Sequence, residues 1–322
     1  MRKIISVLLC ITLVAGLFSG CKKKELSEAK ILMVGDMNAA TAVYLMEATE
    51  KGEAKVPYTF ETAYTMARAI ASIGTGEADI AILPASLATI VYNKTRGAVQ
   101  VYANVWDGEF SIIENGETAK KISDLKGKEI YVSENVNPAA FMLKYILKKN
   151  GLDPEKDITI NYLKDDNELE EKLIDGSVKL AIASQPVKAA VLSKNKALRS
   201  VMNLKSEWNF ITDNAGFVSG SVIISKDFAK KNKATVKKFL KEYEDSVDRV
   251  ATKTSEAAEL CVKHGIMESV DIASSALSTS EIKYVDGKKM KTAFKTYITA
   301  LHGVGMRALG QRAPGKSFYY GA

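Results

Sequence analysis

The chain has 322 residues, of which 47% are hydrophobic and 26% charged, and its formal net charge is +7. These proportions are those of an ordinary globular protein, and the length suits two domains of about 150 residues. The basic excess is spread over Lys-rich amphipathic segments, which are usually solvated helix faces, and this argues against nucleic-acid binding.

The N-terminus has the pattern of a bacterial lipoprotein signal peptide. Two basic residues precede an apolar run over residues 4–18, and two small residues stand directly before Cys21. The run is shorter than the roughly 20 residues that a membrane-spanning helix needs. We therefore expect cleavage of a signal peptide (residues 1–20), lipidation of Cys21 and a polar tether over residues 21–29, which together anchor the protein outside the cytoplasmic membrane. The alternative is an ordinary secretory signal, which would leave a soluble extracytoplasmic protein.

Cysteine and histidine usage argues against disulfides and metal sites. Once the signal peptide is removed and Cys21 is lipidated, Cys261 is the remaining thiol, and its apolar helical surroundings predict a buried packing residue. His264 and His302 are separated in the sequence from each other and from any Cys or carboxylate cluster with metal-ligand spacing. We expect neither a metal nor another cofactor.

From residue 30 onward, short apolar strands alternate with amphipathic helices. The first half predicts strands at 30–35, 58–63, 79–83 and 99–103, with helices at 39–50, 66–75 and 85–93. Strands that are apolar throughout and are separated by helices predict a mainly parallel sheet with both faces covered.

The same pattern restarts near residue 122. It predicts strands at 129–132, 158–162 and 179–183, with helices at 138–150 and 167–175. Both halves contain an acidic–glycine turn, an apolar strand and a proline, at residues 76–84 and again at 175–186. An echo about 100 residues apart is too long for a solenoid repeat, so we interpret it as two similar α/β domains.

The last third of the sequence predicts one strand at 217–225 and then a series of helices. One strand is too few for a separate sheet, so we expect this region to complete the first domain. The predicted division is lobe I over residues 30–104 with 218–322, and lobe II over residues 105–217.

Several short phrases occur in an order that is typical of one protein family. They are the Cys21 lipobox, GEADIA at 76–81, ISDLKGK at 122–128, LKKNGLDP at 147–154, EWN at 207–209 and SFYY at 317–320. In their order and spacing, the chain resembles solute-binding proteins of ABC importers, specifically the nitrate/sulfonate/taurine and thiamine-precursor group.

This resemblance implies a periplasmic-binding-protein type II-like α/β fold. Such a fold has two lobes, a ligand cleft between them, and two crossing strands, expected here near residues 102–106 and 214–219. The resemblance also implies a monomer that captures a small solute and delivers it to an ABC permease with its ATPase.

The candidate ligand residues lie in the loops at the carboxyl ends of the predicted strands, where α/β sheets bind ligands. They are Asp36, Asn38, Ala40, Thr41, Tyr64, Pro84, Ser86, Trp106, Asn135, Asn137, Gln185 and Asn214. Helix starts at residues 39–41 and 85–86 would offer free backbone N–H groups to an acceptor-rich or anionic ligand. Two alternatives stay open, since Asn38 could simply cap a helix and Trp106 could be buried at the lobe junction.

Aromatic and amide side chains in these loops, without Arg or Lys, favour a small polar solute with a flat ring, such as a thiamine-precursor-like heterocycle. An alkyl sulfonate or a nitrate-like anion held by helix N-termini is the alternative ligand, and a surface sensor lipoprotein is the alternative function. An enzyme is disfavoured, because the sequence has no nucleophile-elbow spacing, Walker-type loop or GxGxxG motif.

Overall fold

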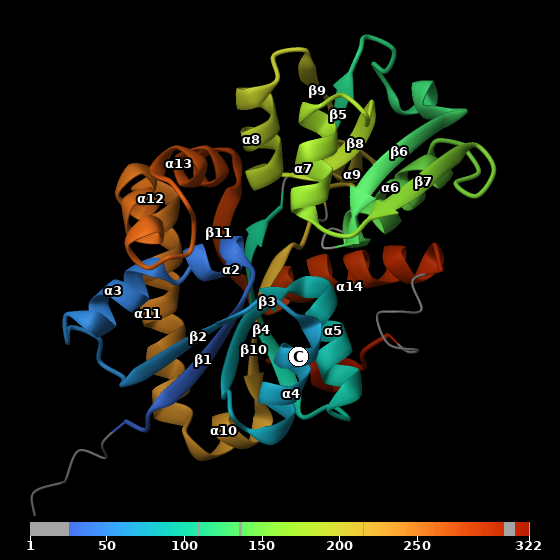
Figure 1. The fold of residues 1–322 in the computed structure, drawn as a ribbon. Coiled ribbons are helices and arrows are strands. Elements are labelled where there is room, and N and C mark those ends of the chain that lie inside the picture. Colours follow the sequence, from blue (N-terminus) through green and yellow to red (C-terminus); the bar gives the residue numbers. More distant parts are fainter. Residues whose placement is uncertain (1–25, 109, 135–136, 215, 306–312, 322) are drawn as a thin grey trace, which may run out of the picture.

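The computed structural model describes residues 26–108, 110–134, 137–214, 216–305 and 313–321. The predicted signal peptide, Cys21 and Asn135 lie outside these ranges. Figure 1 shows two lobes, each built around a β-sheet with helices packed on it. The predicted α/β fold with two lobes is confirmed.

The first lobe contains a six-stranded sheet with the order β11-β4-β10-β3-β1-β2. Its strands are β1 (Ala29–Val34), β2 (Tyr58–Ala63), β3 (Ile80–Pro84), β4 (Val99–Asp107), β10 (Gly220–Ser225) and β11 (Glu281–Asp286). β1 pairs in parallel with β2 and β3, whereas β10 is antiparallel to both β3 and β4. The sheet is therefore mixed, because β10 enters it from the other lobe and runs in the opposite direction.

The second lobe contains a five-stranded sheet with the order β7-β6-β8-β5-β9. Its strands are β5 (Phe110–Asn115), β6 (Lys128–Ser133), β7 (Ile158–Leu163), β8 (Leu180–Ser184) and β9 (Leu198–Asn203). This order repeats β2-β1-β3-β10-β4 of the first sheet, and in each sheet one central strand is antiparallel to its neighbours. The internal echo in the sequence thus corresponds to two sheets of the same topology.

Helices cover both sheets, and a long helical segment follows β10 in the first lobe (Figure 1). The α-helices are α2 (Asp36–Ala40), α3 (Val43–Glu50), α4 (Met66–Thr75), α5 (Ala85–Lys94), α6 (Asn137–Lys149), α7 (Asp166–Ile174), α8 (Gln185–Lys194), α9 (Leu204–Ile211), α10 (Lys226–Lys231), α11 (Lys233–Thr252), α12 (Thr254–Lys263), α13 (Val270–Thr279) and α14 (Gly287–Gly303). Among the residues described, no helix combines the length and apolar character needed to cross a bilayer.

The structure differs from the predicted elements in three strands and one helix. Strands β5, β9 and β11 were not predicted, and the single helix expected at 39–50 is divided into α2 and α3. The first of these helices, α2, begins at Asp36, three residues before the predicted start at residue 39. Gly35, with φ 80°, turns the chain directly from β1 into α2. Cys261 is buried as predicted, and burial raises the pKa of its thiol to about 12.

The two crossings between the lobes lie side by side. β4 belongs to the first sheet as far as Asp107, so the predicted boundary at 104/105 falls inside a strand. The amide of Gly108 donates a 2.6 Å hydrogen bond to Ser219 Oγ, and the amide of Ser219 donates to the Trp106 carbonyl at 3.3 Å. A Cβ on Gly108 would overlap the Ser219 side chain, so this close approach requires a glycine.

The lobes also meet away from the crossings. Helix α13 packs against α8, and α14 packs against α6. Lys205 of α9 forms an ion pair with Glu281 of β11. Of these helices, α8 and α14 each contribute a residue to a cavity between the lobes.

Candidate functional site

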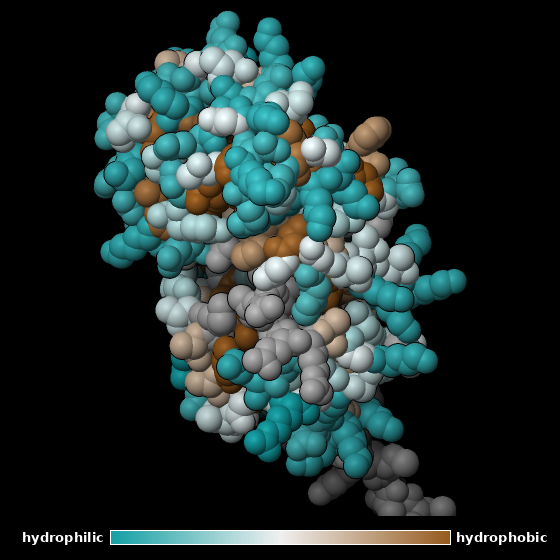
Figure 2. Space-filling view, turned by 90° about the vertical axis from the view of Figure 1, so that its right-hand side faces the viewer, coloured by the Kyte–Doolittle hydropathy of each residue, from teal (hydrophilic) through white to brown (hydrophobic). Residues whose placement is uncertain are grey.

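A cavity of about 360 Å³ lies between the lobes, where β1, β3 and β8 end. Seven predicted ligand residues line it, namely Asp36, Asn38, Tyr64, Pro84, Ser86, Trp106 and Gln185. Figure 2 shows a mainly hydrophilic surface with apolar side chains at the waist between the upper and lower parts of the molecule. A concave site with mixed aromatic and polar lining is typical of small-molecule binding.

Trp106 is held in place at this cavity by Asn38. The indole Nε1 donates a 2.9 Å hydrogen bond to Asn38 Oδ1, while Asn38 Nδ2 donates to the Val34 carbonyl at 2.7 Å. The indole also lies directly against Gly220 of β10, where a Cβ would overlap it. Asn38 does not cap a helix, since Gly35 occupies the N-cap position of α2. Its amide orients an aromatic wall of the cavity.

Other aromatic rings surround the same space. The side chain of Tyr64 is 68% exposed at the rim. Phe110 contacts Phe217 edge-to-face, with ring centroids 5.7 Å apart, and Tyr297 of α14 completes this side. Burial raises the pKa of Tyr297, and a hydrogen bond with Ser86 offsets part of that shift. Such surfaces suit a flat solute.

The two lobes also bring two carboxylates to the cavity. Asp36 begins α2 and Asp166 begins α7, and both line the space. Burial raises the pKa of Asp36, and the negative charges of Asp166 and then Glu268 raise it further. The hydroxyl of Ser133 donates a hydrogen bond to Asp166 Oδ1. None of the described lining residues is Lys or Arg.

Gln185 faces the cavity from the second lobe. Its side chain is 3% exposed, and its Nε2 has no hydrogen-bond partner within the described part of the chain. A buried amide N–H group without a partner costs free energy, so a ligand acceptor at this point would stabilise the protein.

Three of the predicted ligand residues do not line this cavity. Ala40 is fully buried in the core, and the hydroxyl of Thr41 donates to the Asn38 carbonyl at 2.6 Å and contacts the Tyr243 hydroxyl, also at 2.6 Å. Both residues come after the start of α2, so they point into the lobe. Asn214 is exposed with φ 57° and does not line the cavity.

The expected free amides at the helix starts are also largely occupied. The amide of Ala39 donates to the Gly35 carbonyl at 3.0 Å, and the amide of Ala85 donates to the Ser219 carbonyl at 2.8 Å. Asn135 lies outside the described residues, and for Asn137 the structure describes the backbone at the start of α6 but not the side chain. Their predicted ligand contacts stay predictions.

Comparison with known proteins identifies the family. Residues 36–261 match the family model described as the periplasmic substrate-binding protein of the phosphonate ABC transporter. The chain belongs to this family of ABC-transporter substrate-binding proteins. The family consists of periplasmic binding components rather than enzymes, and the membership confirms the predicted importer resemblance. No curated protein matches the chain.

Solved structures of other substrate-binding proteins share this fold. An ABC transporter structure from Parabacteroides distasonis has a TM-score of 0.76 at 19% identity and covers 91% of this chain and 98% of its own. The aliphatic sulphonate-binding protein SsuA of Escherichia coli has a TM-score of 0.65 at 16% identity, with 85% and 88% covered. The nitrate-binding protein NrtA of Synechocystis has a TM-score of 0.59 at 11% identity, with 87% and 82% covered. At these identities the likeness shows the fold alone.

Sequence analysis of this substrate-binding protein missed several residues that line its cleft. They are Val34, Gly35, Met37, Phe110, Asp166, Ser184, Phe217, Ser219 and Tyr297. The internal repeat could have revealed Asp166, because β7 is the counterpart of β2 and the predicted Tyr64 follows β2. Tyr297 lies within a long amphipathic helix and carries no such local signal.

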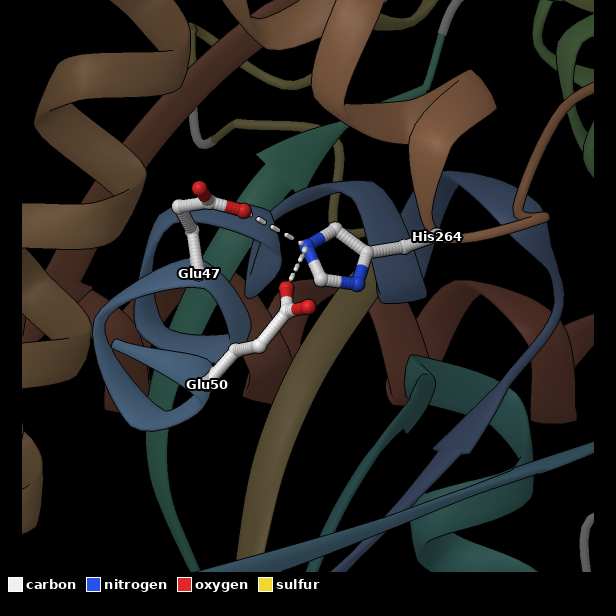
Figure 3. A group of neighbouring side chains, drawn as sticks. All are labelled: Glu47, Glu50 and His264. Carbon is white, nitrogen blue, oxygen red and sulfur yellow. Dashed lines mark hydrogen bonds and ion pairs between the residues drawn. The ribbon is translucent and has the colours of Figure 1, made fainter. Parts of the chain in front are cut away.

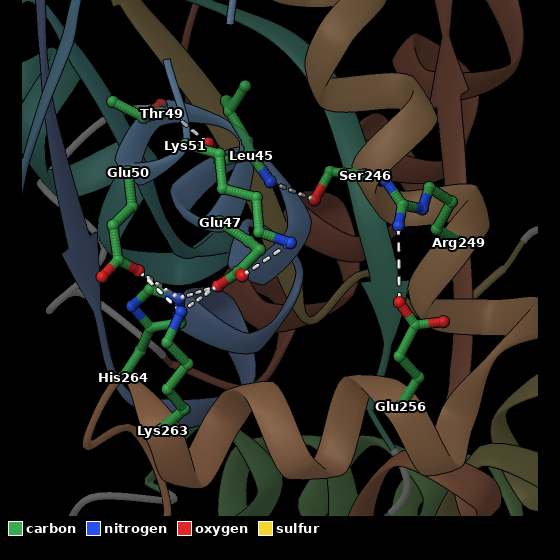
Figure 4. Close-up of polar contacts among 10 residues, drawn as sticks. All are labelled: Leu45, Glu47, Thr49, Glu50, Lys51, Ser246, Arg249, Glu256, Lys263 and His264. Atoms are coloured by element: carbon green, nitrogen blue, oxygen red, sulfur yellow. Dashed lines mark hydrogen bonds and ion pairs between the residues drawn. The ribbon is translucent and has the colours of Figure 1, made fainter. Parts of the chain in front are cut away.

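A second polar cluster, away from the cleft, unites Glu47, Glu50 and His264 (Figure 3). The sequence separates His264 from both carboxylates by more than 200 residues and gave no sign of this contact. Lys263 Nζ contacts Glu47 at 2.7 Å and Glu50 at 2.8 Å, and Lys51 reaches Glu47 at 3.1 Å (Figure 4). Because two lysines already balance the carboxylates, the arrangement is that of an ion-pair network joining α3 to α12.

Proposed function

We propose that this protein is the lipid-anchored, non-enzymatic solute receptor of an ABC importer. It captures a small polar solute with a flat ring between its lobes and delivers it, as a monomer, to the permease and its ATPase. The observation that carries this proposal is the cavity built jointly by the two sheets. The fixed Trp106 lies on one lobe, and on the other lies Gln185, whose Nε2 has no hydrogen-bond partner among the described residues. A site divided in this way is completed by closure of the lobes around the solute.

A thiamine-precursor-like heterocycle fits the chemistry of the lining. Aromatic faces can stack on a ring, Gln185 can donate to a ring acceptor, and Asp36 can accept from an amino substituent. The family name refers to phosphonate, and the similar structures are named for sulphonate and nitrate. Such an anion is less well supported here, because the described lining contains no Lys or Arg and the Ala85 amide is already bonded.

Native mass spectrometry of the protein purified from its own cells tests this function. We expect a bound small molecule whose mass disappears on denaturation. A Trp106→Ala/Gln185→Ala double variant should carry much less of it, whereas Phe210→Ala, at an exposed residue of α9 outside the cavity, should retain it. Equal occupancy in all three proteins would contradict a solute site in the cleft.

A further inference from the structure

One end of the first lobe carries a concentration of exposed basic side chains. They come from two segments that are far apart in the sequence, the end of α5 with the loop after it and the joint between α10 and α11. The two segments adjoin in space, because the amide of Lys226 donates to the Ala98 carbonyl at 2.9 Å. The exposed residues, called the basic end below, are Lys94, Arg96, Lys230, Lys231, Lys233 and Lys237.

These positive charges are not balanced by nearby carboxylates. None of the six residues forms an ion pair with another described residue. Glu77 already pairs with Arg68 at 2.9 Å, and Asp79 accepts a hydrogen bond from a backbone amide at 3.1 Å. Even with the exposed Glu28 and Asp227 set against them, the basic residues are in excess. Such a surface attracts anionic partners.

The segment that follows the predicted tether is fixed at this same end of the lobe. The amide of Ser27 donates to Thr235 Oγ1 at 3.1 Å, and its hydroxyl donates to Asn232 Oδ1 at 2.8 Å. Asn232 itself stands between two of the basic residues. Figure 1 shows α10 beside the start of β1, at the end of the first lobe that lies away from the second lobe.

The short distance along the chain from Ser27 to Cys21 gives this position a meaning. Ser27 follows Cys21 by six residues, which span at most about 20 Å in a fully extended chain. A lipid on Cys21 would therefore hold the basic end close to the surface of the bilayer. Three more lysines, at residues 22–24, occupy the intervening stretch of sequence.

We propose that the first lobe docks on the anionic surface of the bilayer through its basic end. The inference rests on the proposed lipid anchor, because that anchor brings the six basic residues within reach of the head groups. Basic segments next to a membrane are attracted to anionic lipids over distances comparable with the Debye length.

Docking of this kind orients the receptor. The cavity lies where β1 and β3 end, whereas the basic end lies beside the starts of β1 and β4. One strand length, roughly 20 Å for a six-residue strand, thus separates the cleft from the lipid and leaves it open to solutes. Because the attraction is screened by salt and is weaker than insertion of acyl chains, it orients an anchored protein and does not replace the anchor.

Sedimentation with lipid vesicles tests the docking on protein without acyl chains, for which the Cys21→Ala protein serves. Vesicles of phosphatidylcholine alone are compared with vesicles of phosphatidylcholine and phosphatidylglycerol in equal parts. At low ionic strength we expect at least tenfold higher affinity for the anionic vesicles. High salt should abolish this difference, because the interaction is electrostatic.

Substitution of four lysines in this protein identifies the surface that binds. Replacing Lys230, Lys231, Lys233 and Lys237 with Gln should lower the affinity for anionic vesicles at least fivefold, whereas replacing them with Arg should leave it unchanged. The charge-matched control replaces four exposed lysines of the second lobe with Gln and should also leave it unchanged. These are Lys120, Lys121, Lys148 and Lys196.

A second measurement leaves every lysine in place. A solvent-sensitive fluorophore on Ala234→Cys, at an exposed position of α11, should change its emission when anionic vesicles are added. The same label on Ala197→Cys, at an exposed position of the second lobe, should not respond. Cys261 is buried, so the fluorophore attaches to the introduced thiol.

Equal affinity for neutral and anionic vesicles would overturn the docking. Equal losses of affinity in the two sets of Gln variants, or a response of the label at Ala197→Cys but not at Ala234→Cys, would overturn it too. The proposed function is judged separately, because the anchor is tested by fractionation of the Cys21→Ala protein and solute capture by native mass spectrometry.

Discussion

The indole of Trp106 and the side-chain amide of Asn38 form one hydrogen-bonded unit, with Nε1 donating to Oδ1 at 2.9 Å. Asn38 is 3% exposed, and its other amide atom is engaged by the Val34 carbonyl. The strand β4, which leads to the crossing, is thereby tied to helix α2, which follows β1 directly. This contact fixes the aromatic wall of the cleft before any solute arrives.

A double-mutant cycle measures the free energy of the interaction between Asn38 and Trp106. Asn38→Ala removes the hydrogen bonds to the Trp106 indole and to the Val34 carbonyl, and it should lower the free energy of unfolding by about 1–3 kcal/mol. Trp106→Phe removes the first of these bonds and should lower the free energy of unfolding by about 1–2 kcal/mol. Because both remove the same bond, the double variant should cost less than the two single costs added together. Urea denaturation provides the values, and strict additivity would show that the bond contributes nothing.

The close contact between Gly108 and Ser219, where the two crossings meet, can be tested by substitution. Gly108→Ala places a Cβ on the Ser219 side chain, so we expect it to lower the melting temperature by several degrees. Gly108→Ala/Ser219→Gly removes the clash and should recover part of the loss. Calorimetry that shows no recovery in the double variant would rule out this contact as the reason for glycine at position 108.

The ion-pair network between α3 and α12 predicts a dependence of stability on pH. Hydrogen bonds from Lys263 and Lys51 hold the pKa of Glu47 at about 2, below its ordinary value of 4.5. Its contribution to stability is therefore fully present above about pH 4.5 and is lost as the pH falls toward 2.

Glu47→Gln should accordingly destabilise the protein at pH 7, and the difference from wild type should shrink between pH 4.5 and 2. Glu50→Gln, on the same helix but 57% exposed, is the matched control and should cost less at pH 7. Urea midpoints across this range provide the measurement. A difference for Glu47→Gln that stays constant with pH would contradict the assignment.

Anchoring through Cys21 has its own test. Cys21→Ala should move the protein from the membrane fraction to the soluble fraction, because lipidation requires the thiol. Solute binding should be unchanged, since the cleft is built from residues beyond the tether. Retention of the Cys21→Ala protein in the membrane fraction would exclude the lipoprotein interpretation.

The sequence predicts those parts of the fold that local patterns determine. The apolar runs at β1, β3 and β8 are buried strands because they lie within sheets covered on both faces, and the loops after them reach the cleft as expected. The internal repeat in the sequence predicted two domains, and these contain sheets of the same topology. It could not predict that β10 and β5 enter these sheets from the opposite lobe, because strand direction depends on the long-range path of the chain.

Errors at the site have equally specific causes. The helix after β1 begins at Asp36 rather than at residue 39, so Ala40 and Thr41 rotate into the core while Met37 lines the cleft. Phe110 and Phe217 lie beside the crossings, where the chain passes between the lobes and local sequence patterns do not determine which side chains face the cleft.

Solution scattering tests the central claim, that the two lobes capture a solute between them. The solute released by denaturation is added back to solute-free protein, and the radius of gyration is measured before and after saturation. We predict a smaller radius with solute for the wild type and no change for the Trp106→Ala/Gln185→Ala variant. A wild-type radius that stays the same at saturation would contradict capture by lobe closure.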